Sequence, residues 1–93
     1  MIVSFGDGET EKVWNGVRSR RLPLEIQAVA LRKLRLISAA KRLDDLRTPP
    51  GNRLERLKDD RAGQWAIRIN DQWRIAFRWT EGGAEHVAIV DYH

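Results

Sequence analysis

The sequence predicts an α+β fold in which an N-terminal strand and two helices pack on one face of a twisted, mainly antiparallel sheet. Apolar residues recur at helical spacing in the first half of the chain and alternate with polar residues in the second half. Residues 48–52, between the halves, contain two prolines and a glycine, which continue neither a helix nor a sheet. At 93 residues the chain can form one hydrophobic core but not two, so residues 1–93 are expected to form a single domain.

The expected helices follow a short first strand. Residues 1–5 alternate weakly and precede a turn signal at Gly6-Asp7-Gly8. Residues 10–18 are expected to form a short helix, because Val13, Trp14 and Val17 fall on one side of it. Residues 23–43 are expected to form a longer helix, which begins with a proline that a first helical turn tolerates. Its apolar stripe consists of Ile26, Val29, Ala30, Leu34, Ile37 and Ala40.

One charged residue does not fit the stripe of the second helix. Ideal helical geometry places Lys33 inside the apolar face, where a lysine is unusual. We expect its side chain either to extend past the apolar residues to solvent or to mark a gap in the packing.

The second half of the chain is expected to form the sheet. Residues 65–69 and 73–79 alternate strictly and are separated by the turn formers Asn70-Asp71-Gln72, which predicts a hairpin. Glu81-Gly82-Gly83 predicts the next turn, and residues 85–90 a final strand. Residues 53–58 also alternate, with two leucines out of strict phase, which a bulge or a strand end near Arg56 would explain.

The alternation separates a buried face of the sheet from a polar one. Tryptophan, isoleucine and phenylalanine at positions 73–79 make one face apolar, and the helices need such a face to bury their stripes. In the last strand Asp91 is in phase with the buried Val87 and Ile89, and Tyr92 points the opposite way. The polar face is expected to gather Glu55, Lys58, Arg68, Arg74, Arg78 and the terminal residues Asp91, Tyr92 and His93.

Composition limits the class of protein. Lys and Arg total 17 against 13 Asp and Glu, and arginine supplies most of the positive charge, which suits phosphate binding. There is no cysteine, which excludes disulfides and thiolate sites. The N-terminus resembles no signal peptide, and no window approaches the roughly 18 apolar residues of a membrane span, so a cytoplasmic protein without membrane contact is expected.

The polar face carries the groups needed to cleave RNA without a metal ion. Such a reaction requires a base for the 2′-hydroxyl, cations for the developing phosphorane charge and an acid for the departing 5′-oxygen. The two histidines lie far apart and no ligand spacing or phosphate-binding glycine motif is present, so neither metal nor cofactor is expected.

Each of these residues also has an interpretation that requires no catalysis. Exposed strand arginines are commonly solvated positions that discourage edge pairing, and a terminal histidine is commonly a surface residue. The tryptophans fit a packing role, whereas Tyr92 lies on the polar phase, where it could stack on a base. His86 is expected to be an ordinary surface residue. The residues alone leave an RNA-cleaving sheet, an RNA-binding sheet and a solvated face open.

Three segments resemble the HigB family of the RelE/ParE superfamily. They are Pro50-Gly51-Asn52-Arg53-Leu54-Glu55-Arg56-Leu57-Lys58-Asp59-Asp60, Gly63-Gln64-Trp65-Ala66-Ile67-Arg68-Ile69-Asn70-Asp71-Gln72-Trp73-Arg74-Ile75, and Ile89-Val90-Asp91-Tyr92-His93. The opening Ile2-Val3-Ser4-Phe5 fits as well. The resemblance implies a RelE-like fold and a type II toxin, a ribosome-dependent endoribonuclease that cuts mRNA in the ribosomal A site.

The same resemblance implies the partners. A HigA-type helix-turn-helix antitoxin would neutralise the toxin, and DNA would be contacted only through that antitoxin.

The resemblance also implies the site. Its catalytic residues match Lys58, Arg74 and the terminal Asp91, Tyr92 and His93, and we expect outer RNA contacts from Arg53, Arg56, Arg68 and Arg78. In some members a histidine precedes the lysine by three residues. Glu55 stands there in this chain and is a further catalytic candidate, which leaves the general base open.

Two alternatives keep the fold but not the chemistry. A ParE-like relative would inhibit DNA gyrase by binding, and a non-catalytic ribosome or RNA binder would need only the arginine face.

Overall fold

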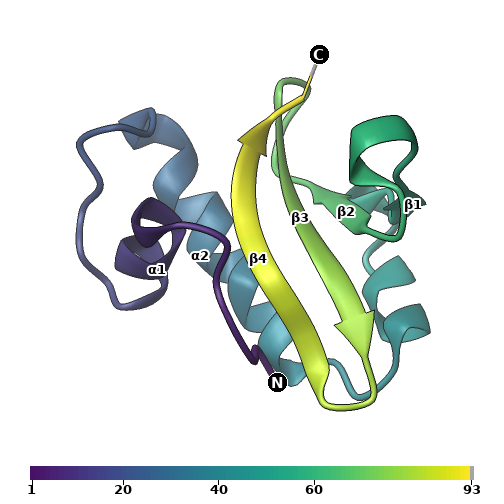
Figure 1. The fold of residues 1–93 in the computed structure, drawn as a ribbon. Coiled ribbons are helices and arrows are strands. Elements are labelled where there is room, and N and C mark those ends of the chain that lie inside the picture. Colours follow the sequence, from purple (N-terminus) through teal and green to yellow (C-terminus); the bar gives the residue numbers. More distant parts are fainter. Residues whose placement is uncertain (93) are drawn as a thin grey trace.

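Two helices cover one face of a four-stranded antiparallel sheet, which confirms the predicted α+β class (Figure 1). The computed structural model describes residues 1–92. The strands follow one another in the order β1-β2-β3-β4, each paired with its neighbour in sequence. The elements are the helices α1 (Gly8–Trp14) and α2 (Leu24–Ala39), the 3₁₀ turns η1 (Leu43–Arg47), η2 (Pro50–Asn52) and η3 (Asp59–Arg61), and the strands β1 (Glu55–Arg56), β2 (Trp65–Arg68), β3 (Trp73–Thr80) and β4 (Gly83–Asp91).

Both helices end earlier than the sequence predicts. The Asp7 carboxylate accepts a hydrogen bond from the Thr10 backbone N–H at 2.7 Å, so α1 begins two residues before the predicted start. It ends at Trp14, before Gly16 with its φ of +77°. Helix α2 ends at Ala39 because the Asp45 carboxylate binds the backbone N–H groups of residues 41 and 42 and starts the separate turn η1.

The N-terminal segment covers the outer edge of β4 but forms no regular strand. Ile2 and Phe5 make isolated parallel bridges to Ala84 and Val87 in place of the predicted strand. Farther along this edge, the hydroxyl oxygen of Thr10 accepts the N–H of Ile89 at 2.8 Å in a fully buried position. The edge of the sheet is therefore closed by the chain itself.

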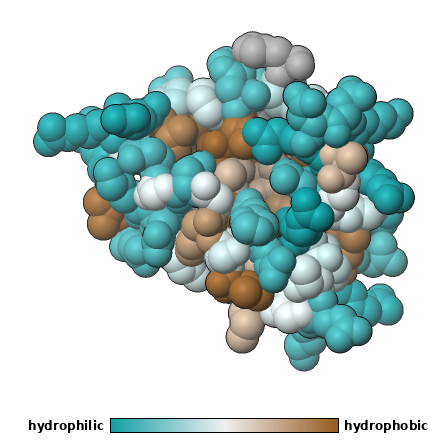
Figure 2. Space-filling model, in the orientation of Figure 1, coloured by the Kyte–Doolittle hydropathy of each residue, from teal (hydrophilic) through white to brown (hydrophobic). Residues whose placement is uncertain are grey.

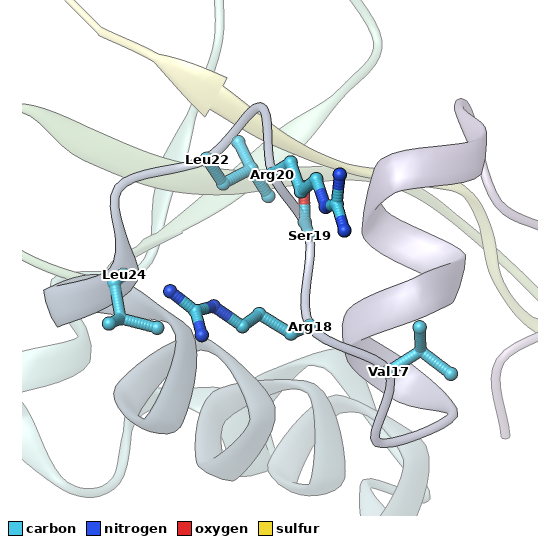
Figure 3. Close-up of a pocket in the computed structure, with 6 residues that line it drawn as sticks. All are labelled: Val17, Arg18, Ser19, Arg20, Leu22 and Leu24. Atoms are coloured by element: carbon cyan, nitrogen blue, oxygen red, sulfur yellow. The ribbon is translucent and has the colours of Figure 1, made fainter.

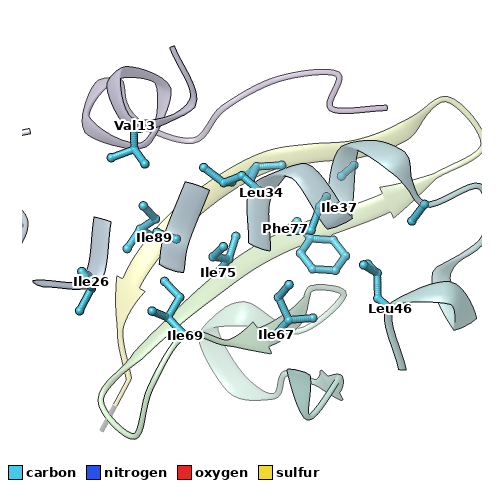
Figure 4. Packing of buried hydrophobic residues seen from close by; sticks show 14 residues of the cluster. Val13, Ile26, Leu34, Ile37, Leu46, Ile67, Ile69, Ile75, Phe77 and Ile89 are labelled. Atoms are coloured by element: carbon cyan, nitrogen blue, oxygen red, sulfur yellow. The ribbon is translucent and has the colours of Figure 1, made fainter. Parts of the chain in front are cut away.

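The core lies between α2 and the sheet, as the apolar phase predicts (Figure 4). Ile67 pairs with Ile75, which pairs with Ile89, so these three isoleucines form a row across β2, β3 and β4. Phe77 lies beside this row, and all of these side chains are buried. Leu34 and Ile37 from α2 and Val13 from α1 pack onto them, while the tryptophans are half-buried at the margin, as expected.

A bulge in β4 shifts its register. Ala76 pairs with Ala88 but Arg78 pairs with Glu85, so β4 contains one residue more than β3 across this interval. His86, with a φ of +53°, is the exposed residue at this point, and its N–H binds the Ser4 hydroxyl at 2.9 Å. The expected surface location of His86 is confirmed. The bulge keeps both Ala84 and Val87 buried, which strict alternation would not allow.

Within residues 1–92, no helix has the length and apolar character required to cross a membrane.

Candidate functional site

The sheet face turned away from the helices has a floor of small side chains. Ala66 and Ala76 are cross-strand partners at its centre and are buried, covered by Leu57 and flanked by Val90. This face is turned to the viewer in Figure 1, since α2 lies behind β3 and β4, and hydrophilic residues predominate in the same view in Figure 2. The small alanine side chains let Leu57 pack closely onto this face of the sheet.

A cleft of about 430 Å³ opens beside this floor, between β1, η3 and the end of β4. It is lined by Glu55, Arg56, Leu57, Lys58, Asp59, Arg61 and Tyr92. Three of the predicted catalytic residues, Glu55, Lys58 and Tyr92, therefore share one cleft although 37 positions of sequence separate the first from the last. Its open, polar wall suits a charged polymer better than an enclosed apolar ligand.

Arg74 is not among the residues that line the cleft, but it contacts two that do and is fixed from several sides. Its guanidinium Nη1 donates to the backbone carbonyls of Asn70 and, at 3.1 Å, of Trp73. Its Nε lies 3.9 Å from a carboxylate oxygen of Glu55, and its Cζ lies 5.1 Å from the centre of the Tyr92 ring. Only 13% of the side chain is exposed. Arg74 is thus a preorganised cation that links β1 to the chain end.

The hairpin turn before Arg74 holds the chain end in place. The N–H of Tyr92 donates to the Gln72 carbonyl at 2.6 Å, and the Gln72 side-chain amide donates to the Asp91 carboxylate at 3.1 Å. Asp91 pairs with Trp73 in the sheet, so it lies on the helix-facing phase and outside the residues that line the cleft. Tyr92 points to the cleft, as its phase predicts. His93, the third predicted residue of this trio, lies outside the described residues.

Lys58 is presented by a short, tightly turned segment. Strand β1 ends at Arg56, as the phase of the leucines indicated. Leu57 then enters the sheet face, with its N–H bonded to the Gln64 carbonyl at 2.9 Å, and Lys58 is the exposed residue before η3. Asp59 follows in the left-handed region with a φ of +56°. This reversal of the chain directly after Lys58 keeps its ammonium group at the cleft.

The four arginines predicted to contact RNA occupy different surroundings. Arg56 lines the cleft, and Arg53 is exposed before β1 with a φ of +46°. Arg78 is exposed farther along β3, where a side chain at Gly63 would lie 3.2 Å from its guanidinium. Arg68 is already engaged by Asp71 at 2.6 Å, and this hydrogen bond is the main reason that the pKa of Asp71 lies below its usual 3.8.

Two residues of this region were missed by the sequence analysis. Arg61 lines the cleft from η3, and its spacing of three residues from Lys58 was the available signal. The sequence predicts only a turn at Gln72, and nothing in its sequence context indicates a contact with Asp91, 19 positions away. Across residues 1–92, no three His, Cys, Asp or Glu side chains are grouped so that they could hold a metal ion.

A second hollow lies on another part of the molecule, in the loop between α1 and α2 (Figure 3). Val17, Arg18, Ser19, Arg20, Leu22 and Leu24 line about 650 Å³ of open space. None of these residues belongs to the cleft, so the two surfaces are separate.

The cleft therefore combines an exposed ammonium group, a carboxylate and an aromatic ring, and the fixed guanidinium of Arg74 contacts the last two. Cations of this kind can bind a phosphate and stabilise additional negative charge on it. The ring provides a surface on which a base can stack.

Comparison with known proteins identifies the relatives of the chain. The family described as the RelE-like toxin of the type II toxin-antitoxin system HigB matches residues 3–93. A protein of Vibrio cholerae serotype O1 named "Toxin HigB-1" is 39% identical over 85 residues, which cover 90% of each chain. A protein of Proteus vulgaris named "Endoribonuclease HigB" is 42% identical over 41 residues, which cover 44% of this chain and 45% of that protein.

Proposed function

Because the chain belongs to the RelE-like toxins of the HigB type II toxin-antitoxin system, we propose that it is an endoribonuclease that cuts mRNA on the ribosome. The family confirms the resemblance read from the sequence and gives the chain a cognate antitoxin as its partner. The name of the Proteus vulgaris relative supports the nuclease activity. The observation that carries the proposal is that Lys58 and Tyr92 line one cleft, and that the fixed guanidinium of Arg74 lies over the Tyr92 ring.

The reaction is an attack of the 2′-hydroxyl oxygen of the mRNA on the adjacent phosphorus. The bond from phosphorus to the 5′-oxygen breaks, which leaves a 2′,3′-cyclic phosphate and a 5′-hydroxyl group. Lys58 and Arg74 stabilise the negative charge that develops on the phosphorane oxygens. Tyr92 stacks on a base and so orients the phosphate.

Proton transfer requires a base for the 2′-hydroxyl and an acid for the 5′-oxygen. We assign acceptance of the 2′-hydroxyl proton to His93, whose unperturbed pKa lies nearest neutrality among the candidates, and orientation of His93 to Asp91. The departing 5′-oxygen takes its proton from water. Glu55 is the other candidate for the general base, but its distance to Arg74 supports a different role. Its carboxylate holds the guanidinium in position from β1.

The shape of the cleft supports the dependence on the ribosome. The site is open and offers few contacts to fix a flexible RNA, so orientation of the 2′-hydroxyl for in-line attack falls to the ribosomal A site. The exposed Arg53, Arg56 and Arg78 supply positive charge around the cleft for contacts with RNA. A HigA-type antitoxin neutralises the toxin in this proposal.

Mapping of mRNA 5′ ends in a translating extract tests the function. We expect wild-type protein to produce new ends that require translation, and Lys58→Ala and deletion of His93 to abolish them. Arg35→Ala, which removes an exposed arginine on α2 away from the cleft, is the matched control and should cut normally. Growth arrest with intact mRNA and inhibited DNA supercoiling would instead indicate gyrase as the target.

A further inference from the structure

A lysine is buried in the apolar stripe of α2. Only 8% of Lys33 is exposed, and its Nζ donates a hydrogen bond to the side-chain carbonyl oxygen of Asn52. The expected extension to solvent is wrong, because the ammonium group is inside the protein and bonded. This contact joins α2 to the loop that precedes β1.

Asn52 is the centre of that loop. It is fully buried, and its side-chain amide donates to the backbone carbonyls of Leu46 at 3.1 Å and of Thr48 at 3.2 Å. Its own N–H donates to the Pro49 carbonyl at 2.9 Å. Asn52 therefore connects η1, Thr48, Pro49 and, through Lys33, the helix. Both polar ends of the amide are used, so no other residue type would keep all these contacts.

The loop leads directly into the cleft. Arg53 turns the chain in the left-handed region, and two residues after it Glu55 begins β1. Strand β1 contains only two residues, paired with two residues of β2, and such a short edge strand has little stability of its own. The placement of Glu55 against Arg74, and of Lys58 at the cleft, therefore depends on what holds the chain before β1.

Packing alone does not explain a lysine at this position. Burial lowers the pKa of Lys33, and the charges of Arg32 and Arg68 lower it further, so the fold disfavours the charged form of this group. A leucine or methionine at the same place in the stripe would avoid this cost. Fixing the position of Asn52 is a role that an apolar side chain could not perform.

We propose that Lys33 and Asn52 are positioning residues for the cleft, which fix the loop of residues 46–53 so that Glu55 is held against Arg74 and Lys58 at the cleft. The inference rests on the proposed function for its catalytic consequence, but the positioning itself is a property of the toxin alone. The contact between Lys33 and Asn52 is then a fourth feature that keeps the site in place. The other three are the hairpin turn, the strand pairing of the sheet and the packing of Leu57.

Hydrogen exchange and cleavage measured on the same variants test the proposal. Lys33→Met removes the ammonium group but keeps the apolar length, and Asn52→Asp keeps an acceptor for Lys33 but removes both bonds to the carbonyls of residues 46 and 48. Arg35→Met removes an exposed positive charge from the same helix and is the matched control. The N–H of Leu57 reports on the segment after β1, and the amides of β3 report on the whole fold.

We expect both variants to exchange the Leu57 N–H roughly 10- to 100-fold faster than wild type, with β3 little changed. This is the factor for loss of one hydrogen bond to a charged group in Lys33→Met and of two neutral hydrogen bonds in Asn52→Asp. The rate of mRNA cleavage at saturating toxin should fall by about tenfold or more, with little change in the toxin concentration needed for half-maximal rate. Arg35→Met should match wild type in both measurements.

Two results would overturn the positioning role. One is an exchange rate of the Leu57 N–H in both variants that equals the wild-type rate, measured with a wild-type toxin that cuts mRNA. The other is an equal loss of protection at Leu57 and in β3 in both variants, because the pair would then support the whole fold rather than β1. Faster exchange at Leu57 with a wild-type protein that cuts no mRNA would overturn the proposed function alone.

Discussion

Replacement of Arg74 by lysine separates the charge of this residue from its geometry. The guanidinium donates to two carbonyls, lies 3.9 Å from Glu55 and covers the Tyr92 ring at 5.1 Å. Lysine keeps the charge but has a single nitrogen, so it cannot reproduce these contacts together. Loss of the contact with the ring costs about 0.5–1 kcal/mol, and complete loss of a transition-state donor typically reduces the rate by about 10²–10³-fold. Arg74→Lys should fall between these limits and cut about 10- to 100-fold more slowly.

Single-turnover cleavage of an mRNA on programmed ribosomes measures this effect. The rate at saturating toxin reports the chemical step, and the toxin concentration for half-maximal rate reports binding. Arg35→Lys, at an exposed arginine of α2 outside the cleft, is the control and should stay close to wild type. A rate for Arg74→Lys within about twofold of wild type would refute the reasoning. So would a defect that excess toxin removes, because Arg74 would then act in binding only.

Three further predictions concern stability, pH and the carboxylate in the cleft. Thr10→Val leaves the buried N–H of Ile89 without an acceptor and should lower the free energy of unfolding by about 1–3 kcal/mol in urea titrations. Thr10→Ser keeps a hydroxyl and should lose less stability. Equal losses in the two variants would contradict the role of this hydrogen bond. Burial lowers the pKa of Lys33 below the usual 10.5, so the unfolded chain binds more protons in the window between the two values. The stability of wild type relative to Lys33→Met should therefore rise as the pH approaches the usual pKa of 10.5 from below, and a constant difference would show that the lysine is not desolvated. Glu55→Gln should slow cleavage by less than about tenfold, because the ion pair between Glu55 and Arg74 is partly exposed and contributes little free energy. A loss of about a hundredfold would instead indicate that Glu55 is the general base.

Much of the fold follows from periodicity. The alternation through β3 fixes which side chains meet α2, and the row Ile67, Ile75 and Ile89 is a direct consequence of it. The helix ends could not be placed in the same way, because they depend on single carboxylates: Asp7 advances the start of α1, and Asp45 sets the turn after α2. Such local hydrogen bonds change a boundary without changing the apolar pattern.

The site was predictable as residue types but not as an arrangement. The strand phase placed Arg74 and Tyr92 on the same side of the sheet, and the structure brings them into contact. The position of the cleft could not be predicted, because it depends on a two-residue strand and on an alanine floor that carries no chemical signal. Lys33 appeared only as an exception in a helical stripe, since its partner Asn52 is 19 positions away.

The central claim is that the 2′-hydroxyl of the mRNA is the nucleophile in a cleft where Lys58 and Arg74 stabilise the phosphorane. It is tested most directly with an mRNA that carries a single 2′-deoxynucleotide on the 5′ side of the scissile phosphate, presented on the ribosome to wild-type toxin. We predict that cleavage at this phosphate disappears, that the toxin still binds, and that a 2′-deoxynucleotide placed one position downstream leaves cleavage intact. Cleavage of the substituted mRNA at the rate of the unmodified one would contradict the account, because the bond would then be broken without the 2′-oxygen.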